Sequence, residues 1–105
     1  MRMDVLTLFP AMFEPVLRES MLRIAQEKGL VEFAVHDLRP FGEGKRRSVD
    51  DRPYGGGPGM VLLCGPVFEA VEQIEAQAGG RARRILTSPQ GRPLTHVLAR
   101  ELAEE

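Results

Sequence analysis

The sequence predicts an α/β domain with an open, mainly parallel sheet and flanking helices. Short apolar runs alternate with helical periods along the chain, which is typical of parallel strands joined by helical crossovers. The 105 residues suit one domain. Hydrophobic residues make up 43% and charged residues 28%, a balance that excludes a disordered segment, a collagen-like repeat and a membrane span. We therefore expect a cytoplasmic protein without a membrane segment.

The first part of the chain is predicted to form a strand, a helix and a second strand. Residues 3–9 form a short apolar run that Pro10 ends. The helix is expected from about Glu14 to Lys28, and its apolar residues recur every three or four positions, which places them on one buried face: Phe13, Val16, Leu17, Met21, Ile24 and Ala25. Residues 31–38 alternate between apolar and polar side chains, as in a second strand.

The last part of the chain is predicted to form a helix, a strand and a helix. Pro66 suits the first position of a helix that ends at Gly79-Gly80, with its acids on the solvated face: Glu69, Glu72 and Glu75. Residues 84–88 are expected to be a third strand, and 89–91 a turn. A helix from Pro93 onward would turn four apolar residues inward: Leu94, Val97, Leu98 and Leu102.

One cysteine and two histidines restrict the metal and redox chemistry. Cys64 has no cysteine partner, and with His36 and His96 it cannot complete a four-ligand zinc site. We expect Cys64 to be a small core residue and His36 to be a half-buried strand residue rather than a base. His96 should lie on the solvent side of its helix. No metal site is predicted.

Residues 42–65 hold seven of the eleven glycines and show no sustained period. An irregular segment of this length is usually functional or disordered. Bare glycine backbone can approach a planar or anionic ligand, and its flanks supply groups that pair with base edges and stack on bases: Asp50, Asp51, Arg52 and Tyr54. A flexible connector is an equally weighted alternative. No known phosphate-loop spacing occurs here.

Residues 86–92 lie at the carboxyl end of the predicted third strand, and open parallel sheets bind ligands at the carboxyl ends of their strands. Ser88 and Gln90 offer polar side chains there, although an ordinary turn is the simpler interpretation of these residues alone. Basic residues gather in two stretches of a chain whose net charge is only −1, namely 39–52 and 81–92. Both stretches are compatible with a polyanionic ligand or with solvated loops.

Three segments together resemble one family: MDVLTLFPAMFEPV (3–16), VDDRPYGGGPGM (49–60) and LTSPQGRPL (86–94). They are similar to the N-terminal part of bacterial tRNA (guanine-N1)-methyltransferases, which belong to the SPOUT class with a trefoil knot. The resemblance implies a homodimeric enzyme. It would transfer a methyl group from S-adenosylmethionine to N1 of the guanine 3′ of the anticodon.

The resemblance also implies roles for three sets of residues. The S-adenosylmethionine loop would comprise Leu86, Thr87, Ser88, Pro89 and Gln90. The loop bordering the methyl donor and the target guanine would contribute Asp50, Tyr54, Gly55, Pro58 and Gly59. Contacts to tRNA phosphates in the anticodon stem-loop would come from Arg46, Arg47 and Arg52.

Other parts of the family pattern are expected beyond Glu105. They are the remaining knot loops, the catalytic base and the C-terminal tRNA-binding domain, so residues 1–105 would be the N-terminal part of the methyltransferase domain. The last helix lacks a C-cap and ends in two acids that oppose its dipole, as expected of a chain cut between units. Such a piece should be inactive alone, and an exposed sheet edge should make it less stable or self-associating.

Two other function classes remain open on the sequence. One is a small α/β RNA-binding module that uses the basic stretches and the glycine-rich segment without catalysis. The other is a nucleotide-binding α/β domain, which the missing phosphate loops weaken.

Overall fold

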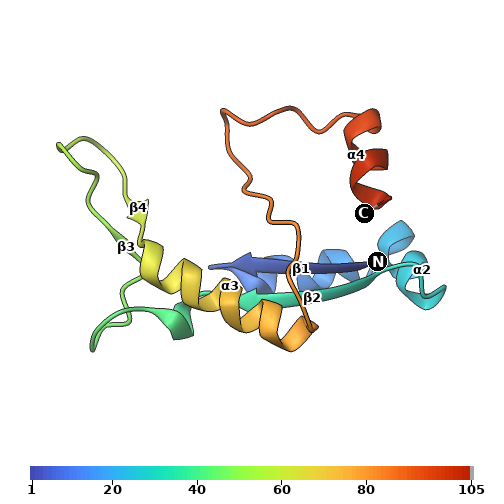
Figure 1. Ribbon diagram of the computed structural model, residues 1–105, viewed down its shortest axis with the longest axis horizontal. Coiled ribbons are helices and arrows are strands. Elements are labelled where there is room, and N and C mark those ends of the chain that lie inside the picture. Colours follow the sequence, from blue (N-terminus) through green and yellow to red (C-terminus); the bar gives the residue numbers. More distant parts are fainter. Residues whose placement is uncertain (105) are drawn as a thin grey trace.

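A two-stranded parallel sheet is the centre of the computed structural model, which describes residues 1–104 (Figure 1). Strand β1 (Arg2–Thr7) pairs with β2 (Glu32–Asp37), with Arg2 opposite Glu32 and Thr7 opposite Asp37. Helices α1 (Glu14–Leu17) and α2 (Ser20–Glu27) connect the strands. The predicted strand–helix–strand unit and its parallel pairing are therefore confirmed.

The connection between the strands corrects the single helix predicted from Glu14 to Lys28. Helix α1 ends at Leu17 and α2 begins at Ser20, whose φ is +50°. The break rotates the two apolar stripes relative to one another, so the predicted buried face is not continuous. Val16 is 61% exposed and Met21 74% exposed.

Helix α3 (Cys64–Ala78) carries the largest share of the small core. Pro66, Ala70 and Ile74 are buried on one side of it, and Ala70 packs with Leu38 and Val49. Partly buried apolar residues surround this cluster: Leu6, Leu8, Phe41 and Val67. The core thus joins α3 to the ends of both strands.

The ends of α3 differ in how well the sequence predicts them. Gly79 ends the helix with φ +84°, as expected of a left-handed C-cap. The start lies at Cys64 rather than at Pro66. Cys64 is exposed, so its prediction as a core residue is wrong. Two residues correspond to roughly 200° around a helix, which places Cys64 opposite the buried Pro66.

The glycine-rich segment includes a short antiparallel hairpin, which the sequence did not predict. Strand β3 (Asp50–Asp51) pairs antiparallel with β4 (Val61–Leu62). Between β2 and β3 lie the short 3-10 helix η2 (Arg39–Phe41) and a turn closed by a bridge between Glu43 and Ser48. The hairpin projects from the end of the sheet toward which β1 points (Figure 1).

The predicted third strand at residues 84–88 is not formed within residues 1–104. Glu75 holds Arg84 against α3 through contacts of 3.1 and 2.9 Å to the two carboxylate oxygens. Glu75 is therefore half-buried rather than solvated. Beyond Arg84 the chain leaves the sheet (Figure 1), and Leu86 is 85% exposed. A strand requires a paired neighbour, and none lies beside this segment in the described residues.

Helix α4 (His96–Ala103) is shorter than the helix predicted from Pro93 onward. The Thr95 hydroxyl accepts a hydrogen bond from the Leu98 amide at 3.2 Å, which caps the helix and leaves Leu94 outside it. Leu94 and Val97 are exposed, whereas Leu98 and Leu102 are half-buried. The inward face is thus only partly as predicted, and His96 is exposed as expected.

Candidate nucleic-acid interface

The hairpin between β3 and β4 presents bare backbone to solvent. Four of its glycines have φ between +79° and +112°, a region that other residues rarely adopt: Gly55, Gly56, Gly57 and Gly59. No atom lies within 4 Å of the Cβ position of any of them, so the glycine requirement is conformational. Tyr54 at the start of this run is 100% exposed. The tip therefore combines open peptide groups with one free aromatic ring.

Charged residues flank this tip on β3. Asp50 and Asp51 are exposed, and Asp51 accepts a hydrogen bond from the Arg52 backbone amide at 2.7 Å. The Asp50 carboxylate and the Arg52 guanidinium are without a side-chain partner among residues 1–104. One acceptor group and one donor group are thus available to a ligand beside the glycines.

Arg46 and Arg47 lie in the turn that precedes the hairpin. Glu43 and Ser48 exchange backbone hydrogen bonds of 2.8 and 2.9 Å, which close the turn. Arg47 has φ +51°, and its backbone packs so closely on Gly42 that a side chain there would clash. Lys45 and the two arginines are exposed. The turn and the hairpin project from the same end of the sheet (Figure 1).

The predicted donor loop at residues 86–90 lies apart from the hairpin (Figure 1). Ser88 organises it, because its hydroxyl accepts from the Gln90 amide at 3.2 Å and its carbonyl accepts from the Gly91 amide at 3.1 Å. Leu86 and Thr87 have exposed side chains, and their backbone groups have no partner within residues 1–104. These backbone groups are therefore open to hydrogen bonding with a ligand.

Two residues at the carboxyl ends of the strands were missed by sequence reasoning. Phe9 follows β1, and Arg39 follows β2. The Arg39 guanidinium lies 5.7 Å from the centroid of the Phe9 ring. Phe9 lies in the motif segment 3–16 and Arg39 begins the basic stretch 39–52, but neither was singled out as a site residue. The rule that open parallel sheets bind ligands at this edge was a further signal.

His36 is not part of this interface. Its Nε2 lies 2.8 Å from Asp4 Oδ1, and both side chains are largely buried beside the sheet. Arg2 makes a bidentate contact to the same carboxylate at 2.9 Å. The hydrogen bond from Arg2, reinforced by His36, lowers the pKa of Asp4. The prediction of a half-buried structural histidine is therefore confirmed.

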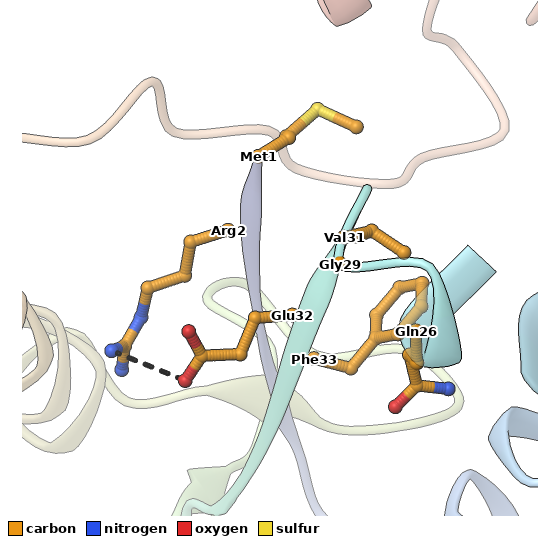
Figure 2. Close-up of a pocket in the computed structure, with 7 residues that line it drawn as sticks. All are labelled: Met1, Arg2, Gln26, Gly29, Val31, Glu32 and Phe33. Atoms are coloured by element: carbon orange, nitrogen blue, oxygen red, sulfur yellow. Dashed lines mark ion pairs between the residues drawn. The ribbon is translucent and has the colours of Figure 1, made fainter.

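Two hollows on the surface lie away from the predicted site. Figure 2 shows the first, about 540 Å³, at the amino ends of β1 and β2, where Arg2 and Glu32 are 3.9 Å apart. The second, about 500 Å³, follows the α1–α2 break and includes Pro15, Val16 and Met21. Ligands of open parallel sheets bind at the opposite, carboxyl edge, so neither hollow is favoured as the site.

Residues 1–104 contain neither a candidate metal cluster nor a candidate membrane helix. Residues 1–104 bring together no three His, Cys, Asp or Glu side chains that could hold a metal ion. Among these residues, no helix has the length and apolar character needed to cross a bilayer.

Comparison with known proteins bears directly on the three motif segments. The family model described as tRNA (guanine-1)-methyltransferase TrmD matches residues 1–105. The chain belongs to this family. A tRNA (guanine-N(1)-)-methyltransferase of Bacillus licheniformis is 53% identical over the whole chain, and one of Geobacillus kaustophilus is 54% identical. The chain spans 43% of the length of each.

A solved structure also resembles this TrmD-family chain. The crystal structure of tRNA (m1G37) methyltransferase from Aquifex aeolicus matches with a TM-score of 0.88 and 36% sequence identity. The match covers all of this chain and 47% of that one. The predicted fold class, the N-terminal portion of a SPOUT α/β domain with a parallel sheet, is confirmed.

Proposed function

We propose that this chain forms the N-terminal part of an enzyme that methylates N1 of the guanine 3′ of the tRNA anticodon. The observation that carries the proposal is the family match along all 105 residues, and the exposed glycine-rich hairpin supports it. The activity is proposed for a full-length protein, that is, one as long as the relatives, of which this chain spans 43%. Residues 1–105 alone are expected to be inactive.

The hairpin supports this proposal through its chemistry. Its open peptide groups and the Asp50 carboxylate offer donors and acceptors to the edge of an unstacked base, and the Tyr54 ring offers a stacking surface. Gly55 and Gly59 have no side chains that would obstruct a base, and the ring of Pro58 restricts the backbone between them. We assign this loop to the border of the target guanine and the methyl donor.

The three exposed arginines Arg46, Arg47 and Arg52 would contact the phosphates of the anticodon stem-loop. Arginine is suited to this role because its planar guanidinium can donate two parallel hydrogen bonds to one phosphate. Their position at the same end of the sheet as the hairpin supports binding of one continuous stretch of RNA (Figure 1). Binding should therefore weaken as the salt concentration rises.

S-adenosylmethionine is proposed as the methyl donor, and its reactive sulfonium would supply the methyl group. Leu86 through Gln90 would hold one side of it: the Leu86 side chain offers an apolar surface, and the free backbone groups of Leu86 and Thr87 offer hydrogen bonds. Ser88, Pro89 and Gln90 fix the turn that positions these groups. The remaining contacts are proposed to come from the part of the protein beyond Glu105.

The proton on guanine N1 must be accepted as the methyl group is transferred. A base has to lie within about 3 Å of that atom. We assign no residue of this chain to that role and propose that the base lies beyond Glu105. The complete protein is further proposed to be a cytoplasmic homodimer.

The test uses a fusion protein, defined as this chain followed by the remaining residues of the Bacillus licheniformis relative. Tritium from methyl-labelled S-adenosylmethionine is expected in a tRNA transcript with the fusion protein and not with the chain alone. Binding of tRNA without transfer would instead support the RNA-binding module. Binding to the fusion protein is also measured by calorimetry with ATP, NAD and S-adenosylmethionine. Binding of ATP or NAD without binding of S-adenosylmethionine would support a nucleotide-binding domain.

A further inference from the structure

Phe9 and Arg39 are held in place where β1 and β2 end. The Phe9 amide donates to the Thr7 hydroxyl at 3.0 Å, and the Arg39 amide donates to the Asp37 carboxylate at 2.9 Å. The backbone at Phe9 is therefore held by Thr7, and the backbone at Arg39 by Asp37. This edge of the sheet is the one at which open parallel sheets bind ligands.

The Arg39 guanidinium is oriented by two contacts. It lies 5.7 Å from the centroid of the Phe9 ring, and its Nε donates to the Leu8 carbonyl at 3.3 Å. The terminal nitrogens have no hydrogen-bond or ion-pair partner within residues 1–104, and the residue is exposed. A planar pair of donors is thus held at the surface with little side-chain freedom left to lose on binding.

The surroundings of Arg39 point to a polyanion. The turn with Arg46 and Arg47 follows η2 directly along the chain and projects from the same end of the sheet as the hairpin (Figure 1). Exposed basic residues therefore occur in the turn and beside the glycine-rich loop, at the same end of the sheet as Arg39. The nearest carboxylate in sequence, that of Asp37, already accepts the Arg39 amide and does not pair with the guanidinium.

We propose that Arg39, which lies over the Phe9 ring, binds a backbone phosphate of the substrate RNA. This inference rests on the proposed function and adds a contact at the strand ends to those expected from Arg46, Arg47 and Arg52. A phosphate accepts two parallel hydrogen bonds from the terminal nitrogens of a guanidinium, and the contacts with the Phe9 ring and the Leu8 carbonyl favour the orientation from which these nitrogens face solvent.

The test measures binding of a tRNA transcript to the fusion protein as a function of salt. Arg39→Gln should weaken binding about tenfold and lower the slope of log affinity against log salt by roughly 0.7 to 0.9, the contribution of one phosphate. Phe9→Leu keeps the positive charge of Arg39 but removes the ring beneath its guanidinium. The salt slope should therefore stay the same, while the affinity for tRNA falls about threefold. Arg23→Gln is the matched control, since Arg23 pairs with Glu27 at 2.7 Å on α2, away from this edge.

Several outcomes would overturn the inference. The first is an unchanged salt slope in a folded Arg39→Gln variant. The second is an equal fall in slope and affinity in the Arg23→Gln control, because an equal fall would indicate that only net charge matters. If Arg39→Gln does not fold, Arg39→Lys is measured instead. We expect the slope of log affinity against log salt to stay the same and the affinity for tRNA to fall several-fold. An unchanged affinity would contradict a bidentate contact made by a guanidinium over the Phe9 ring. A fusion protein that binds no tRNA at all would contradict both this inference and the proposed function, whereas a failure confined to Arg39 leaves the latter intact.

Discussion

Asp4 is a largely buried carboxylate with two charged or ionisable partners. It accepts two hydrogen bonds from Arg2, which is in the same strand β1. It accepts one more from His36 of β2, and this contact links the two strands. The Arg2 guanidinium, with His36 as the second partner, holds the pKa of the carboxyl below its ordinary value. A lowered pKa means that the folded chain prefers the ionised carboxylate more than the unfolded chain does.

Asp4→Asn should therefore lower the free energy of unfolding by about 1 kcal/mol near neutral pH, where the carboxylate is ionised. The contribution of Asp4 is present above its unfolded pKa of about 4 and is lost as the pH falls through the lowered folded value. Urea unfolding of the two proteins from about pH 7 to about pH 3 measures this difference. A gap that stays constant over that range would show that the charge on Asp4 is not responsible.

Ser20 adopts a left-handed conformation at the start of α2, with φ +50°. Such a conformation costs an ordinary residue roughly 1–2 kcal/mol, and glycine only part of that. We expect Ser20→Gly to raise the free energy of unfolding by about 0.5 kcal/mol and the β-branched Ser20→Val to lower it by about 1 kcal/mol. Urea midpoints provide the measurement. Equal stability of the valine and serine forms would argue against a left-handed residue at this position.

Single residues differed in how far the sequence could predict them. His36 lies in an alternating strand pattern, and that local pattern was enough to predict a half-buried structural residue. Cys64 has apolar neighbours in sequence, but its exposure follows from the rotation between Cys64 and Pro66 on α3, which depends on where the helix begins. Arg39 could not be selected because its contact with Phe9 joins residues that lie thirty positions apart along the chain.

The hairpin between β3 and β4 is the element on which the candidate site depends. Gly57 has φ +112°, where any other residue is strained, although open space surrounds its Cβ position. In the fusion protein, Gly57→Ala should lower the methyl-transfer rate at least about tenfold by misplacing the loop. Steady-state transfer to a tRNA transcript is the measurement.

Gly80→Ala is the matched control for that substitution. Gly80 also has open space around its Cβ position, but its φ lies outside the left-handed region. Its activity should stay within about twofold of the parent. Equal losses in both variants, or none in Gly57→Ala, would mean that the conformation of the hairpin does not control the reaction.

At the scale of elements, the sequence predicted those that local periodicity determines. β1, β2 and most of α3 follow from apolar patterns within each segment. The helix break at Arg18 and Glu19 escaped prediction because apolar residues continue with helical spacing across it. The strand expected at residues 84–88 failed for another reason: a strand depends on a partner, and residues 1–104 supply none beside it. β3 and β4 are too short for an alternating pattern to reveal them.

The whole molecule is expanded for its length. Its radius of gyration is 15.9 Å, whereas a compact domain of this size would have roughly 13 Å. Large apolar side chains remain exposed on α1, α2 and the segment before α4, including Met21, Leu86 and Leu94. Since the chain spans 43% of its relatives, these surfaces are consistent with contacts that the remaining length of such a protein would make.

The identity of the methylated atom tests the central claim most directly. The fusion protein is incubated with S-adenosylmethionine and a tRNA transcript carrying guanine 3′ of the anticodon, and the digested RNA is analysed by mass spectrometry. We predict N1-methylguanosine at that position, and none with residues 1–105 alone. A methyl group on another atom or another base, or no methylation by a folded fusion protein that binds both substrates, would contradict the claim.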